Sequence, residues 1–132
     1  MITKIKIGEN EYEINSNAYT RFLYKKVFGN SIIDDLNPLI EFAEKTRQKT
    51  EELEKLGIKE EELNTQIGLF VMRLPEFDSY METIYKMAYI FIKTQDEAFM
   101  DFESWLKTID KVSLSDKWVT EVTELAVSSF YR

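Results

Sequence analysis

Apolar and charged side chains alternate along the first fifteen residues with the period of two that a β-strand requires. Ile5 and Ile7 alternate with lysines, and Tyr12 and Ile14 alternate with glutamates. A turn midway between the two runs pairs Ile7 with Tyr12 and Ile5 with Ile14, which places all four apolar side chains on one side. Because an isolated hairpin is marginal in water, the pattern predicts a β-hairpin over about 2–15 whose apolar face is covered by helices.

Helical spacing follows the hairpin. Ser16 or Asn17 can cap a helix whose apolar positions recur three and four residues apart, and Gly29 can end it. The apolar face predicted for this helix consists of Tyr19, Phe22, Leu23 and Val27.

The stretch 34–63 is much more polar. Pro38 favours a helix start at its own position, and Gly57 suits a helix C-terminus. Between them the apolar stripe is thin, and Thr46 and Thr50 stand where apolar residues are expected. Such a polar helix lies on a surface. The pattern therefore predicts either a projecting or a flexible helical arm over 34–63.

Four more helices are predicted towards the C-terminus. The first begins at the acidic residues 60–62 and ends or kinks at Pro75. The segment 77–93 is apolar on most sides and is the best candidate for a central buried helix. Residues 94–97 match a capping box for the next helix. Ser115 can cap a last helix, which ends at Phe130 and Tyr131 next to the terminus.

These elements predict an α+β fold, a mostly α-helical single domain over 1–132 with a small N-terminal β-hairpin and helices over about 17–131. A chain of 132 residues suits one hydrophobic core. Its apolar share of 44% is ample for folding, which argues against general disorder.

Histidine and cysteine are both absent from the chain. The usual general base, the thiolate nucleophile and the common transition-metal ligands are therefore missing, and we expect no enzyme, no cofactor and no metal site. Asp34 and Asp35, and the run of acids at 60–62, lie where helices are expected to begin. There they favour the helix dipole, which explains them without a cation.

Seventeen basic and twenty-four acidic residues give a net charge of −7, without an evident basic stripe. We therefore expect no nucleic-acid partner. The most apolar run contains Glu82 and Lys86 and is too short to span a bilayer, and the N-terminus lacks a signal-peptide core. These features predict a cytosolic protein.

The tryptophans leave two interpretations open. Trp105 and Trp118 lie on apolar helical faces, which is typical of a core, but tryptophan is also enriched among interface anchors. The last helix can pack against its own domain, another copy or a different protein. We take as a candidate partner-binding set Trp105, Trp118, Val122, Leu125 and Phe130.

Both ends of the chain resemble the tail assembly chaperones of long-tailed phages and Gram-positive prophages. The N-terminal stretch is "KIKIGENEYEINSNAYTRFLYKK", a short hairpin that leads into an aromatic and basic helix. The C-terminal stretch is "DFESWLKTIDKVSLSDKWVTEVTELAVSSFYR". The positions that carry the C-terminal motif are Phe102, Trp105, Leu106, Trp118, Glu121, Val122, Glu124, Leu125, Ala126, Ser129 and Phe130.

The resemblance implies a non-catalytic role. Such chaperones bind the tape-measure protein, keep it soluble and help recruit the major tail protein, in the host bacterial cytoplasm, and are usually absent from the mature virion. Self-association is left open. Two alternatives remain, a head–tail connector or tail component that forms rings, and a small acidic regulatory binding protein.

Overall fold

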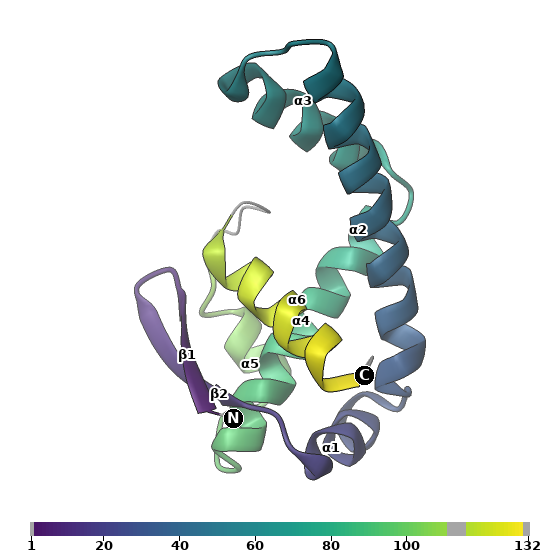
Figure 1. Cartoon of the computed structure of the whole chain (residues 1–132). Helices are drawn as coiled ribbons and strands as arrows, with labels where there is room; N and C mark the ends of the chain where they lie inside the picture. Colours follow the sequence, from purple (N-terminus) through teal and green to yellow (C-terminus); the bar gives the residue numbers. More distant parts are fainter. Residues whose placement is uncertain (1, 111–115, 131–132) are drawn as a thin grey trace. The chain divides into compact units, whose positions relative to one another are not determined.

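The computed structural model describes residues 2–110 and 116–130, and Ser115 and Tyr131 of the expected last helix lie outside them. The described residues form an N-terminal antiparallel hairpin followed by six helices (Figure 1). This confirms the predicted fold class, a mostly helical single domain whose hairpin packs on helices. The elements are β1 (Ile2–Ile7), β2 (Asn10–Asn15), α1 (Ala18–Phe28), α2 (Ile32–Lys55), α3 (Glu60–Arg73), α4 (Phe77–Gln95), α5 (Phe102–Leu106) and α6 (Lys117–Phe130).

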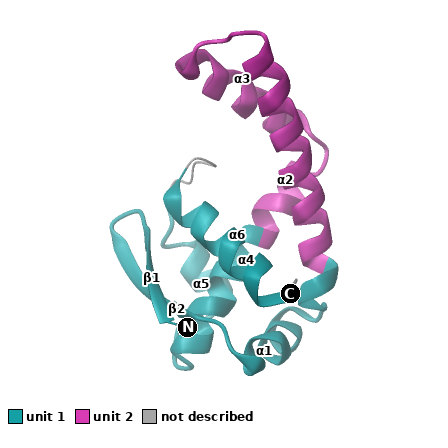
Figure 2. Cartoon of the chain, in the orientation of Figure 1, with its two compact units in different colours: residues 1–34, 84–132 teal, residues 35–83 magenta. Residues whose placement is uncertain are grey.

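Within this fold the chain forms two compact units (Figure 2). Unit 1 consists of residues 1–34 and 84–132, and unit 2 of residues 35–83. The boundaries fall inside α2 and α4, so each of these helices contributes to both units. No helix in the described ranges is long and apolar enough to cross a membrane.

The hairpin forms in a different register from the predicted one. Ile5 pairs with Tyr12, and Thr3 pairs with Ile14. The reason is that the loop consists of Gly8 and Glu9, whereas the predicted turn was centred on Glu9 and Asn10. Gly8 has a φ of 63°, and none of the described non-glycine residues has a positive φ, which fits a type II′ turn with glycine first. The shift moves the pairing by two residues and therefore leaves every side chain on its predicted face.

α1 begins and ends where the pattern predicts but buries a different face. The Asn17 side chain accepts a hydrogen bond from the Tyr19 amide at 2.9 Å, and Gly29 ends the helix with a φ of 80°. Thr20, Leu23 and Tyr24 are buried, whereas Tyr19, Phe22 and Val27 are exposed, Phe22 by 73%. The predicted apolar face was therefore wrong at three of its four positions.

α4 is the central helix of unit 1, as predicted. Its residues 87–92 are all buried. Its C-terminal end joins α1 through a chain of hydrogen bonds. The Asn17 amide donates to the Thr20 hydroxyl at 3.0 Å, and the Thr94 hydroxyl donates to the carbonyl of Ile90 at 2.7 Å. Since Thr94 has only one hydroxyl hydrogen, Thr20 must donate in their 3.1 Å contact.

The capping box predicted at residues 94–97 was wrong. Thr94 is still inside α4, where its hydroxyl bonds back to the preceding turn. The next helix begins seven residues after α4 ends and is capped by Asp101, whose carboxylate accepts from the Ser104 amide at 3.0 Å.

Unit 2 contains most of the polar stretch 34–63, which is helical over most of its length. Pro38 lies inside α2 rather than at its start, so the predicted start was wrong. The helix continues through the proline because Ile32, Leu36 and Leu39 are buried at helical spacing, 1%, 0% and 1% exposed, and packing outweighs one missing backbone bond. The projection or flexibility of this stretch stays a prediction.

Aromatic stacking and surface charge hold unit 2 together. The rings of Phe42 and Tyr80 stack at 4.0 Å, and Lys45 pairs with Glu76 at 2.6 Å. On the exposed face of α2, Arg47 bonds both Glu44 and Glu51, one helical turn away on either side. These pairs explain how a helix with a thin apolar stripe remains helical.

We predict that Thr20→Val destabilises unit 1 by about 1–2 kcal/mol, because it leaves the Asn17 amide without its acceptor and the partly buried Thr94 hydroxyl without its donor. Urea unfolding measures this. Thr20→Ser, which keeps the hydroxyl, is the matched control. A Thr20→Val variant as stable as Thr20→Ser would show that the hydrogen-bond chain does not contribute to stability.

Candidate interaction surface

α6 is amphipathic, and its inner face belongs to the core of unit 1. Trp118, Val122 and Ala126 recur four residues apart and are at most 2% exposed. Its outer face mixes acidic, apolar and small polar residues. The sequence produces this division because the apolar positions follow helical spacing while Glu121, Glu124 and Ser128 fall on the other side.

Trp105 is fully buried at the centre of an aromatic cluster. α5 holds it there, since Asp101 caps the helix through both the amide and the hydroxyl of Ser104, at 3.0 and 2.7 Å. These hydrogen bonds lower the pKa of the Asp101 carboxyl. The distances between ring centres from Trp105 are 5.8 Å to Tyr89, 6.2 Å to Phe102, 6.4 Å to Tyr12 and 6.4 Å to Tyr85.

Trp118 joins the same cluster from α6. Its ring lies 6.0 Å from that of Tyr85, and desolvation together with the charge of Asp116 raises the pKa of the Tyr85 hydroxyl. Within the described part of the chain, neither the Trp105 nor the Trp118 indole N–H has a hydrogen-bond acceptor. Both tryptophans thus contribute packing rather than polar contacts.

Tyr89, another ring of the cluster, also forms a hydrogen bond to the backbone. Its hydroxyl donates to the carbonyl of Met100 at 2.7 Å and so fixes the segment that leads into α5. Burial, and secondarily the negative charge of Asp101, raises the pKa of this hydroxyl. The Lys93 ammonium, on α4, also donates to the carbonyl of Phe99 in this segment at 3.2 Å.

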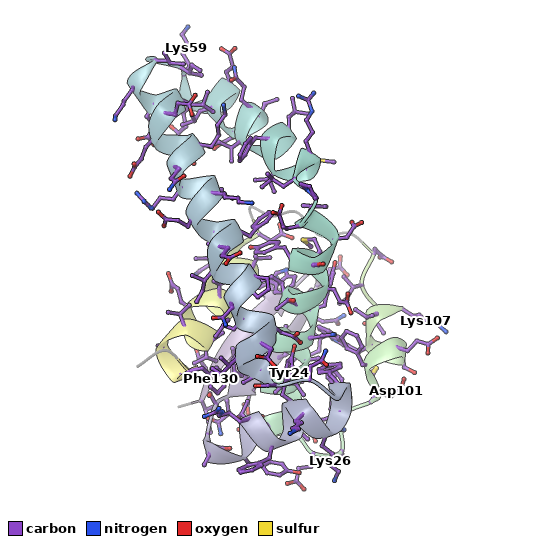
Figure 3. All side chains as sticks on the ribbon, turned by 90° about the vertical axis from the view of Figure 1, so that its right-hand side faces the viewer. Tyr24, Lys26, Lys59, Asp101, Lys107 and Phe130 are labelled. Atoms are coloured by element: carbon purple, nitrogen blue, oxygen red, sulfur yellow. The ribbon has the colours of Figure 1, made fainter. Side chains whose placement is uncertain are left out.

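Leu125 and Phe130 differ from the other three candidate residues because both are only partly buried. Phe130, labelled in Figure 3, stacks on Phe91 of α4 with ring centres 6.4 Å apart and planes 4° apart. Leu125 lines an open hollow of about 630 Å³ on the outer side of α6. The hollow lies between β1 and α6, and its lining residues are Thr3, Glu121, Thr123, Glu124, Leu125, Val127 and Ser128.

The structure therefore divides the candidate set. Trp105, Trp118 and Val122 are core residues of unit 1, in agreement with the first of the two interpretations of the tryptophans. Leu125 and Phe130 reach the surface, where their role in partner binding stays a prediction. Val127, which is 37% exposed at the rim of the hollow, was not among the predicted residues. Val127 follows Leu125 by two residues and so lies outside the apolar stripe of the helix. An apolar residue off this stripe is the sequence signal that could have identified it as exposed.

A second hollow, of about 650 Å³, lies over α1 and the start of α2, within unit 1. Phe22, which the sequence analysis assigned to an apolar face, lies here beside two basic residues. The lining residues are Ala18, Arg21, Phe22, Lys25, Ser31 and Ile32. Three basic and no acidic residues are found in α1, so this helix does carry a short basic stripe.

The described residues contain no group of three or more acidic side chains placed to hold a metal ion. Asp34 and Asp35 lie in the first turn of α2 and Glu60–Glu62 in the first turn of α3, as predicted. Both hollows are open, and apart from the buried Ile32 their lining side chains are exposed or partly exposed, a form suited to protein contacts.

No family model, no curated protein and no solved structure matches this chain.

We predict that Tyr89→Phe lowers the free energy of unfolding by about 1 kcal/mol at neutral pH, because the Met100 carbonyl loses its donor. The hydroxyl has a raised pKa in the folded state. The contribution of the Tyr89 hydroxyl to the free energy of unfolding is therefore complete below the unfolded-state pKa of about 10. This contribution is lost as the pH rises through the higher folded-state pKa.

Urea unfolding between neutral pH and the alkaline limit measures this difference. The wild-type protein is expected to lose its advantage over Tyr89→Phe in the alkaline range. Tyr19→Phe, at an exposed ring of α1, is the control and should match the wild type at neutral pH. An advantage that persisted unchanged through the alkaline range would contradict the assignment.

Proposed function

We propose that this protein is a tail assembly chaperone of a long-tailed phage or prophage, which binds the tape-measure protein and acts in the bacterial host cytoplasm. The resemblance of both ends of the chain to that family supports the proposal. Among structural features, the open hollow beside α6 supports it most, because the residues that line it include positions of the family-like C-terminal motif, Glu121, Glu124 and Leu125.

The physical task of such a chaperone is to cover apolar helical stripes. A tape-measure protein is a long helix, and an uncovered apolar stripe on it drives aggregation. A helix binds to a groove through apolar anchors three and four residues apart. Leu125 and Val127 supply apolar surface in the hollow, while Glu121 and Glu124 supply acceptors and negative charge at its rim.

The core of unit 1 gives this surface a rigid support. Trp118 and Val122 fix the inner face of α6, so that its outer face keeps one geometry in the absence of a partner. A preorganised surface loses less conformational entropy on binding, which raises affinity for a given contact area. On this account the tryptophans act as support, and Leu125 is the anchor.

The overall acidity fits a chaperone that must remain soluble with apolar positions exposed. Unit 2 has twelve acidic and six basic residues and so carries nearly all of the net charge of −7. Recruitment of the major tail protein is part of the proposal.

We predict that Leu125→Asp keeps the fold but weakens tape-measure binding at least tenfold, about 1.4 kcal/mol, because it replaces an apolar anchor with a charge. The assay is an affinity pull-down from cells in which the phage assembles, quantified by mass spectrometry, with circular dichroism as the test of fold. Thr120→Asp adds the same charge to an exposed position of α6 outside the hollow and should bind like the wild type.

Each other outcome has a distinct meaning. Unfolding of Leu125→Asp would assign Leu125 to the core and remove it from the interface. Equal weakening by Thr120→Asp would show that charge on α6, rather than the hollow, affects binding. A wild-type pull-down without tape-measure protein would contradict the proposed function, and presence of this protein in purified virions would favour a ring-forming tail component.

A further inference from the structure

α1 presents a surface that the fold of its own unit does not use. Phe22 is 73% exposed, and Ala18, Phe22 and Lys25 recur four and three residues apart along the same exposed stripe. Spacing of this kind forms the seam along which one helix packs against another. A large aromatic side chain left exposed in such a seam indicates a contact with another protein surface.

The charge of this stripe defines what can bind it. Arg21, Lys25 and Lys26 are exposed, and none of them has an ion pair within the part of the chain that is described. Lys26 is labelled on α1 in Figure 3. The helix therefore has an apolar centre surrounded by three cations that no described side chain pairs, and the matching surface is an acidic helix with apolar anchors.

The chain itself contains such a helix. α3 begins with Glu60–Glu62, and its exposed positions Glu62, Thr65, Leu69 and Met72 are three, four and three residues apart. Leu69 is 48% exposed and Met72 is 64% exposed. Within the described residues neither Glu61 nor Glu62 forms an ion pair.

We propose that α1 of one copy of this protein packs antiparallel on α3 of a second copy. In this orientation Phe22 packs against Leu69 and Met72. Lys25 and Lys26, in the last turn of α1, then point towards the acidic first turn of α3. The antiparallel arrangement also places the two helix dipoles in opposition, which is favourable.

The charges at the ends of the two helices select this orientation. A parallel arrangement would place the basic end of α1 beside Arg73, the basic residue in the last turn of α3, and repel it. Unit 2, to which α3 belongs, has a formal charge of −6, whereas α1 has a charge of +3. α6 takes no part in this contact, so the inference does not depend on the proposed function.

The contact joins two different surfaces, and this determines its test. Two variants break it from opposite sides, Phe22→Ala with Lys25→Ala on α1 and Leu69→Ala with Met72→Ala on α3. A third, Met100→Ala with Lys107→Ala, is the matched control, because it removes one exposed apolar and one basic side chain elsewhere. Alanine preserves helix propensity, and circular dichroism checks each fold.

Sedimentation velocity over a range of concentrations measures association. The wild type and the control should associate with increasing concentration and dissociate with added salt. Each of the other two variants alone should associate at least tenfold more weakly. Their equimolar mixture should regain association, because an intact α3 of the first then meets an intact α1 of the second.

Several results would overturn the inference. They are a wild type that stays monomeric at all concentrations, an α1 or α3 variant that associates like the control, and a mixture that remains monomeric. If a double variant unfolds, Lys25→Gln, which removes only the charge, replaces it in the test. Unchanged association of Lys25→Gln with unchanged salt dependence would contradict the α1–α3 contact.

Discussion

A continuous network of aromatic rings is the interaction on which the rest of unit 1 depends. Tyr89 of α4 and Trp105 of α5 together form its centre. Trp105 contacts Tyr12 of the hairpin and Tyr85, and Tyr85 in turn contacts Trp118 of α6. Each ring pair adds about 0.5–1.5 kcal/mol to the free energy of burial. Elements far apart in the sequence therefore share one core. The rings of the network are Tyr12, Tyr24, Phe28, Tyr85, Tyr89, Phe99, Phe102, Trp105 and Trp118.

The sequence was a good guide wherever one physical signal dominated. Alternation predicted the hairpin faces, continuous apolarity predicted the buried part of α4, and Asn17 and Gly29 predicted the ends of α1. It failed where two signals competed. Pro38 indicated a helix start, but α2 continues through it because residues on both sides of the proline are buried. In the hairpin, a turn that begins at Gly8 shifted the register by two residues.

The candidate surface was harder to predict than the fold, because an apolar residue at helical spacing can face either the core or a partner. Phe22 and Leu23 are adjacent and both apolar, yet only Leu23 is buried. The polar Thr20 takes the inner position because Thr94 and the Asn17 amide satisfy its hydroxyl. Thr94 is 74 residues away from Thr20 in the chain, so no local sequence pattern could reveal this contact. The same limit applies to Trp105 and Trp118, whose burial depends on rings from several elements.

The central claim is that this protein keeps a tape-measure protein soluble, and the most direct measurement is the amount of soluble tape-measure protein made in bacteria with and without it. On our account the tape-measure protein is insoluble alone, and co-expression moves it into the soluble fraction in a complex that contains this protein. If co-expression leaves the soluble amount unchanged, or if the tape-measure protein becomes soluble without forming that complex, the account is contradicted.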